Sequence, residues 1–153
     1  MSITCHIIAI GKNKDAGLQR LIDEYIKRLS WKVIITELPV LNVSDAERKS
    51  REAEQLRQAI PAKAVKICLD ERGKNIGSEV FANQLQHYFT NQQSTLAFII
   101  GGADGLDETF RKQADYVISF GALTWPHMMV RLMLVEQLYR ASTILSGHPY
   151  HRV

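Results

Sequence analysis

The chain has 153 residues, of which 46% are hydrophobic and 23% are charged, and its formal net charge at pH 7 is +3. These values are typical of one globular domain and argue against a disordered or fibrous protein. Two cysteines are too few for a disulfide scaffold or a four-ligand zinc site, and no apolar run approaches the roughly 20 residues of a membrane helix. No basic signal-peptide segment opens the sequence, so we expect a cytoplasmic protein.

The first part of the chain predicts a strand, a helix and a second strand. Residues 3–10 are apolar and rich in β-branched side chains, and they end at Gly11, as a buried strand does. Apolar residues then recur with helical spacing from Leu18 to Leu29. Residues 32–38 again have strand character and precede a proline.

The middle of the chain continues this alternation. Ser44 and Glu47 have the spacing of a capping box, and they open a charged helix over about 45–60. A third strand is expected at 64–69 and is followed by a polar loop. Apolar residues at helical spacing predict another helix over about 78–89.

The last part of the chain predicts two more strands and a long helix. The strands are expected at 95–100 and 116–120, with a short helix between them. A long helix over about 127–145 should stop at Gly147, because glycine is the usual residue after a helix end. A short tail, residues 148–153, follows and is rich in histidine, tyrosine and arginine.

Apolar strands that alternate with helices predict an α/β protein with a mostly parallel sheet and helices on both faces. Ligands of such sheets bind at the carboxyl ends of the strands, which here means the loops 70–77, 101–105 and 121–126. Neither a dinucleotide-binding glycine motif nor a P-loop is present. The glycines in these loops either let the backbone approach a flat ligand or simply turn the chain.

The helix over 127–145 is too apolar for a single buried stripe. Since the chain is long enough for only one domain, we expect the second apolar side to meet another copy of the chain in a homodimer. Arg131 and Arg140 on this helix can serve the site or can simply pair with Glu136.

Five short stretches carry a resemblance to a known family: LDERGK at 69–74, IGGADGL at 100–106, LTWPH at 123–127, EQLYRA at 136–141 and PYHR at 149–152. Together, and in this order over the whole chain, they resemble the RlmH-type ribosomal RNA methyltransferases of the SPOUT class. The sequence departs from the family at three places: Ala103-Asp104 replaces a common Pro-Glu, Gly121 replaces a serine, and Val153 replaces an acidic residue.

The resemblance implies a single SPOUT domain over 1–153 whose C-terminal part, about 64–153, forms a trefoil knot and binds S-adenosyl-L-methionine. It also implies a homodimer that methylates N3 of a pseudouridine in a 23S rRNA hairpin. The cofactor contacts that it implies are Leu69, Gly102, Gly121, Ala122, Leu123, Thr124, Trp125 and Pro126.

Methylation of N3 requires removal of an imide proton and stabilisation of the resulting charge. The candidate catalytic residues are Tyr150, His151 and Arg152 in the tail and His127 at the start of the long helix. An imidazole suits a base, and a guanidinium suits imide oxygens or a phosphate. His127 can instead orient its loop, and the tail can instead be a solvated end. No acidic or cysteine ligands flank the tail histidines, so we expect no metal.

Two other functions remain open: a SPOUT-like enzyme that acts on another RNA such as transfer RNA, and a ribosome-binding module without catalysis. Positive charge is concentrated in residues 1–76, with 14 basic side chains against 10 acidic ones, whereas residues 77–153 have 5 against 6. A basic half is compatible with a surface that faces RNA. A solubilising surface explains the same counts equally well. We expect no membrane partner.

Overall fold

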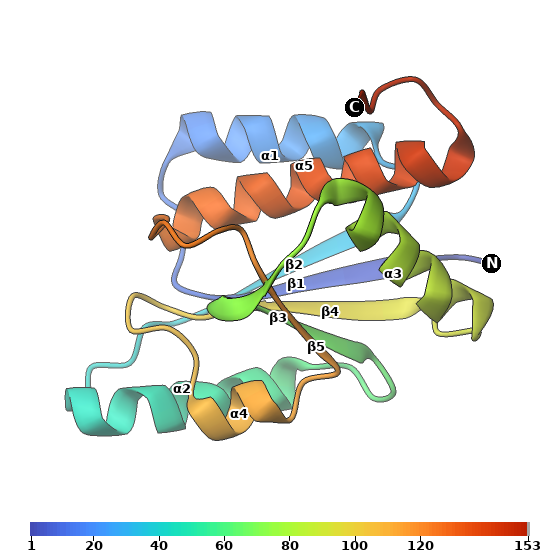
Figure 1. The fold of residues 1–153 in the computed structure, drawn as a ribbon. Helices are drawn as coiled ribbons and strands as arrows, with labels where there is room; N and C mark the ends of the chain where they lie inside the picture. Colours follow the sequence, from blue (N-terminus) through green and yellow to red (C-terminus); the bar gives the residue numbers. More distant parts are fainter. Residues whose placement is uncertain (153) are drawn as a thin grey trace.

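The computed structural model describes residues 1–152, and its centre is a sheet of five parallel strands (Figure 1). The strands lie in the spatial order β2-β1-β4-β3-β5. Their bounds are β1 Thr4–Ile10, β2 Lys32–Leu38, β3 Val65–Asn75, β4 Thr95–Ile100 and β5 Tyr116–Ser119. Every neighbouring pair is parallel. The predicted α/β class with a parallel sheet is therefore confirmed.

Helices cover both faces of the sheet (Figure 1). On one face lie α1 Ala16–Arg28, α3 Ser78–Thr90 and α5 His127–Ser146, and on the other lie α2 Asp45–Ala59 and α4 Glu108–Lys112. The crossovers with α1 and α3 move toward the β2 edge, whereas those with α2 and α4 move toward the β5 edge. Opposite directions on opposite faces give all four crossovers the same hand, as parallel sheets nearly always have.

Each face of the sheet has its own hydrophobic core, because side chains alternate between the two faces along a strand. In β1, Ile7 packs with α1, α3 and α5, whereas the next residue, Ile8, packs with α2 and α4. Phe98 and Ile99 divide in the same way in β4. Burial on both faces explains why the central strands are apolar throughout rather than alternating.

The expected end of the third strand at residue 69 is wrong. Leu69 and Lys74 both pair with Ile118 of β5, so residues 70–73 bulge out of the ladder before the strand resumes. The stretch has the sequence of a loop because most of its residues are polar, but its backbone returns to pair with β5. The trefoil knot that the family resemblance implies stays a prediction.

The ends of two helices test the predicted caps. Gly147 ends α5 in the left-handed region, with a φ of 78°, as predicted. Ser44 precedes α2, but its side chain makes no capping hydrogen bond, so the predicted capping box is not formed. Instead, the Glu47 backbone N–H donates to the Ser44 carbonyl at 3.0 Å. Among residues 1–152, we find no helix with the length and apolar character that crossing a membrane requires.

Candidate functional site

A cavity of about 330 Å³ opens at the carboxyl ends of β3, β4 and β5. Its wall consists of segments 69–72, 100–105, 118–121 and 123–125, with Lys49 from α2 and the first turn of α5. This is the edge at which open parallel sheets bind ligands, and the volume lies at the lower end of the range for small-molecule sites. The structure thus brings together the three glycine-containing loops that the sequence singled out.

Most residues predicted to contact the cofactor lie on this wall. Those that line the cavity are Leu69, Gly102, Gly121, Leu123, Thr124 and Trp125. Ala122 and Pro126 belong to the same segment as the last four but do not line the cavity. The cofactor role of all eight stays a prediction.

The segment after β5 is held in shape by its own hydrogen bonds. The Ser119 hydroxyl donates to the Gly121 carbonyl at 2.8 Å and accepts from the Gly121 N–H at 3.1 Å. Gly121 has a φ of 110°, which favours glycine over any other residue. The Trp125 indole N–H donates to the Phe120 carbonyl at 3.2 Å and closes the turn. The segment therefore presents an ordered backbone to the cavity, with Leu123 exposed at its tip.

Arg72 joins two of the cavity loops, through an ion pair within its own loop and a hydrogen bond to the backbone at the end of the next. The Arg72 guanidinium donates to both Asp70 carboxylate oxygens, at 2.8 and 2.9 Å, and to the Leu106 carbonyl at 3.0 Å. Burial would raise the pKa of the Asp70 carboxyl, but hydrogen bonds and charge from Arg72 hold it below its usual value. Both residues stand in the LDERGK stretch, but neither is among the predicted site residues, because a charged pair in a polar loop is typical of ordinary surface.

The Gly101–Gly105 loop is tied to α2. Arg48 forms an ion pair with Asp104 at 3.2 Å and also donates to the Leu41 and Val43 carbonyls. A side chain at Gly102 would meet Ile10 at 3.3 Å rather than fill the cavity. Gly102 therefore presents only its backbone to the cavity, and its missing side chain matters for packing against β1.

His127 lies on the cavity wall at the start of α5. Burial, and then the nearby positive charge of Arg131, lower the pKa of His127 below its usual value of 6.5. The imidazole is therefore neutral at pH 7, with a free lone pair that can accept a proton.

We expect the pH dependence of ligand binding to report on His127. Because the pKa is lowered, its positive charge appears only as the pH falls below 6.5. Affinity for a cationic ligand such as S-adenosyl-L-methionine should be flat between about pH 7 and 8 and fall roughly three- to tenfold toward about pH 5.5, through charge repulsion. Calorimetry at each pH measures this. His127→Gln should give a flat profile, and an unchanged slope in that variant would contradict the assignment.

Arg131 is a structural residue rather than a free cation at the site. Its guanidinium is fully buried, pairs with Glu37 at 2.5 Å, and donates to the Gly11 carbonyl at 2.6 Å. It therefore fastens α5 to the carboxyl ends of β1 and β2. The expected pairing with Glu136 is wrong for Arg131, since the β1 carbonyls and Glu37 are closer, and is confirmed for Arg140 at 2.6 Å.

The tail is packed against the molecule rather than solvated. The Tyr150 ring meets Tyr139 edge-on with centroids 4.6 Å apart, and its hydroxyl donates to Glu136 at 3.1 Å. Burial and hydrogen bonding raise the pKa of Tyr150, so its phenol stays protonated at pH 7 and is a donor, not a base. His151 lies 3.1 Å from the Arg140 guanidinium, whereas Arg152 is exposed.

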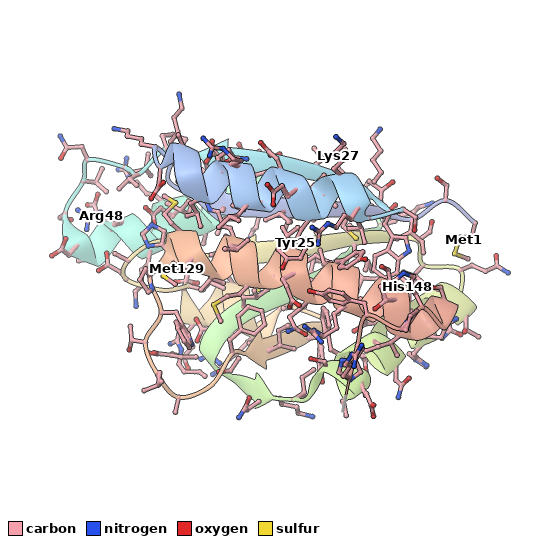
Figure 2. All side chains as sticks on the ribbon, turned by 90° about the horizontal axis from the view of Figure 1, so that it is seen from above. Met1, Tyr25, Lys27, Arg48, Met129 and His148 are labelled. Atoms are coloured by element: carbon pink, nitrogen blue, oxygen red, sulfur yellow. The ribbon has the colours of Figure 1, made fainter. Side chains whose placement is uncertain are left out.

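The tail and the cavity are separate within one chain. After α5 ends, the chain folds back along that helix, so the tail lies over its C-terminal half (Figure 1). Figure 2 shows Met129, near the first turn of α5, and His148 at opposite ends of the helix. His127 is thus grouped with the predicted cofactor contacts, whereas Tyr150, His151 and Arg152 are not among the residues that line the cavity.

No group of three potential metal ligands is found among residues 1–152. His148 and His151, the only histidines in the tail, differ in their surroundings: the His148 ring accepts from the Tyr150 backbone N–H at 3.2 Å, whereas His151 faces Arg140 and Glu79. Their contacts are those of a docked tail.

Comparisons with known proteins agree with this architecture. Residues 3–151 match the family model described as "Predicted SPOUT methyltransferase". A protein named ribosomal RNA large subunit methyltransferase H from Rhodospirillum centenum is 44% identical over 147 residues, covering 95% of this chain and 97% of the relative. A protein of the same name from Ruegeria sp. (strain TM1040) is 47% identical over 153 residues, covering 97% and 98%.

Solved structures show the same fold at low sequence identity. A probable methylase family protein from Haemophilus influenzae has a TM-score of 0.57 at 12% identity, covering 97% of this chain and 70% of that one. A probable methyltransferase from Bordetella pertussis has a TM-score of 0.54 at 12% identity, covering 92% and 96%. The family model spans nearly the whole chain, and the full-length relatives exceed 40% identity. This chain therefore belongs to the SPOUT methyltransferase family.

Proposed function

We propose that this protein methylates N3 of a pseudouridine in a 23S rRNA hairpin, in the large ribosomal subunit or the assembled ribosome, with S-adenosyl-L-methionine as the methyl donor. The observation that carries the proposal is the cavity at the carboxyl edge, where the loops that bear the family's motifs converge. Two relatives named for methylation of large-subunit ribosomal RNA support the substrate class. The chain would act in the cytoplasm as one domain over 1–153, with its cofactor-binding part in about 64–153.

The side chains around the cavity fit an adenosyl group. Leu69, Leu123 and Trp125 offer apolar walls for a flat ring, and Gly102 and Gly121 leave backbone polar groups accessible. The hydrogen bond from Arg72, itself oriented by Asp70, to the Leu106 carbonyl would keep two of the loops at a fixed separation before the ligand arrives. Preorganisation of this kind lowers the entropy cost of binding.

S-adenosyl-L-methionine supplies a methyl group on a positively charged sulfur. The chain's own residues must remove the imide proton from N3 and stabilise the negative charge that develops. His127, neutral at pH 7 and on the cavity wall, is suited to accept the proton. Arg152, with its guanidinium exposed, is suited to hold an imide oxygen or a phosphate, and Tyr150 and His151 to position it.

A homodimer would reconcile the two separated groups of candidate residues. The outer surfaces of α1 and α5, with Phe120, form an apolar groove between the tail and the loop 121–126. It is lined by Leu21, Tyr25, Phe120, Leu132, Met133, Glu136 and Gln137. A second copy seated on this groove would bring its tail toward the first copy's cavity. We propose that each active site combines the cavity of one protomer with the tail of its partner.

Light scattering at micromolar concentration should therefore give about twice the chain mass of 17.4 kDa. Met133→Asp places a charge in the groove and should shift the protein to monomer. Val40→Asp, at an exposed apolar residue outside the groove, is the matched control and should stay dimeric. A wild-type monomer that still methylates RNA would overturn the shared active site.

Mass spectrometry of rRNA tests the function itself. The 23S rRNA of a strain without this protein should lack one methyl group on a pseudouridine, and the purified protein with S-adenosyl-L-methionine should restore it on ribosomes. A methyl group missing from transfer RNA instead would identify the enzyme as a SPOUT relative with another substrate. Failure to bind S-adenosyl-L-methionine in calorimetry would identify a ribosome-binding module without catalysis.

A further inference from the structure

A second cavity, of about 440 Å³, lies on the other side of the sheet, between the C-terminal end of α2, the start of β3 and α4. Its floor is apolar and includes the buried Phe110 ring, Ala114 and the Cys68 thiol. Three cationic side chains line it: Arg57, Lys63 and Lys66. The proposed methyl transfer uses none of these residues.

The charged side chains that line this second cavity are all cationic. No carboxylate is among the described residues that line it. Two carboxylates lie beside it. The Asp115 carboxylate accepts from the Lys66 backbone N–H at 2.8 Å, and Glu54 lies 3.4 Å from Arg57, where both side chains are solvent-exposed and the pair is weak. The Arg57 guanidinium also lies 5.5 Å from the centre of the Phe110 ring, which holds it over the floor. An apolar floor beneath a cationic rim suits a ligand with a flat ring and a negative charge.

The second cavity has no group that could perform chemistry at neutral pH. Burial raises the pKa of the Cys68 thiol to about 12, so it is not a nucleophile. The other lining side chains are apolar, an amide, lysines and an arginine. The cavity is therefore suited to binding, not to a reaction.

Helix α2 contributes residues both to the second cavity and to the first one, at the carboxyl ends of β3, β4 and β5, which is called the cofactor cavity below. Lys49, on its N-terminal half, lines the cofactor cavity, and Arg57, near its C-terminal end, lines the second one. Eight residues of α-helix separate them by about 12 Å along the axis. The face of the sheet with α2 and α4 is opposite the face with α1 and α5 (Figure 1), and the groove proposed for the dimer is lined by residues of those two helices. One strand of RNA could therefore contact the cofactor cavity and the second cavity of the same protomer while the dimer is formed.

We propose that the cavity between α2, β3 and α4 holds a nucleotide of the RNA substrate, with an unpaired base stacked on the Arg57 guanidinium above the apolar floor and its phosphate near Lys63 and Lys66. This inference rests on the proposed function, because it takes RNA as the substrate. Base stacking and phosphate neutralisation are the usual means by which proteins hold unpaired RNA. The second nucleotide contact would fix the register of the strand at the cofactor cavity.

Binding to ribosomes from a strain without this protein, measured over a series of salt concentrations, tests the proposal. Lys63→Glu/Lys66→Glu should weaken ribosome binding at least about tenfold. It should also reduce the slope of log affinity against log salt concentration by about two, since two phosphate-facing cations are lost. Lys27→Glu/Lys32→Glu makes the same charge change at exposed lysines of α1 and β2 and should change affinity by less than about threefold. Affinity for S-adenosyl-L-methionine should stay unchanged in both variants.

Ultraviolet crosslinking of the wild-type protein on ribosomes provides a measurement that needs no variant to fold. Crosslinked nucleotides should map to peptides that contain Phe110 or residues 57–66. Equal weakening by the two lysine pairs, or no crosslink to these peptides, would overturn the proposal. Binding of free uridine or adenosine monophosphate without any effect of Lys63→Glu/Lys66→Glu on ribosome binding would also overturn it, because the cavity would then serve a free nucleotide.

The two hypotheses fail in different ways. Wild-type protein that crosslinks through this cavity but leaves rRNA unmethylated contradicts the proposed reaction and supports the nucleotide site. Normal rRNA methylation with ribosome binding that is insensitive to Lys63→Glu/Lys66→Glu contradicts the site and supports the reaction.

Discussion

Removal of residues 150–153 is expected to lower methyl transfer by at least about 100-fold, the range for loss of an acid–base or charge-stabilising group. The deletion takes away Tyr150, His151 and Arg152 together. It should leave S-adenosyl-L-methionine binding nearly unchanged, because the predicted cofactor contacts all lie in the loops of the cavity and none lies in the tail. Single-turnover methylation of ribosomes, with calorimetry for the cofactor, separates the two effects.

The structure also sets the controls for this truncation. The truncated protein loses the contacts of the Tyr150 ring with Tyr139 and Arg140, which should lower the free energy of unfolding by about 1–2 kcal/mol. Activity is therefore compared well below the melting temperature of the truncated protein. Arg152→Ala should reproduce much of the activity loss without that cost, since Arg152 is exposed. Val153→Ala, outside the described residues, should be silent. Near-normal turnover of the truncated protein would remove the tail from the active site and leave His127 as the candidate.

Gly73→Ala should be strongly destabilising although it adds only a methyl group. A Cβ at this position would lie 2.7 Å from backbone atoms of Val117 and Ile118. Backbone cannot move aside as the end of a flexible side chain can, so the bulge of β3 must separate from β5. We expect a loss of about 2–4 kcal/mol in the free energy of unfolding and weaker binding of S-adenosyl-L-methionine.

Gly77→Ala is the matched control, because nothing lies within 4 Å of a Cβ at that position. Its φ of −78° is open to any residue, so the change should cost less than about 1 kcal/mol. Urea denaturation of the two variants beside wild type measures the difference. Equal stability of Gly73→Ala and Gly77→Ala would contradict the close approach of β3 to β5.

The elements of this fold follow from local patterns in the sequence. The observed β2 and β4 have the predicted bounds, and α5 ends at the predicted glycine. These features depend on the period of apolar residues and on the left-handed conformation that glycine permits, both of which are local. The three loops of the site could be found for the same reason, since parallel strands bring their carboxyl ends to one edge.

The tertiary structure decided what depends on contacts between distant residues. The polar stretch after Leu69 looks like a loop until β5 supplies its partner, and Arg131 finds Glu37 rather than the nearby Glu136 because the sheet places β2 beneath α5. Contacts between distant segments also form the hydrogen bond from Arg72 to Leu106, the packing of Tyr150 on α5 and the second cavity beside α2. Sequence periodicity indicates which face of an element is apolar, but not which element will cover that face. For the same reason, the proposed union of one chain's cavity with its partner's tail could not be predicted from periodicity.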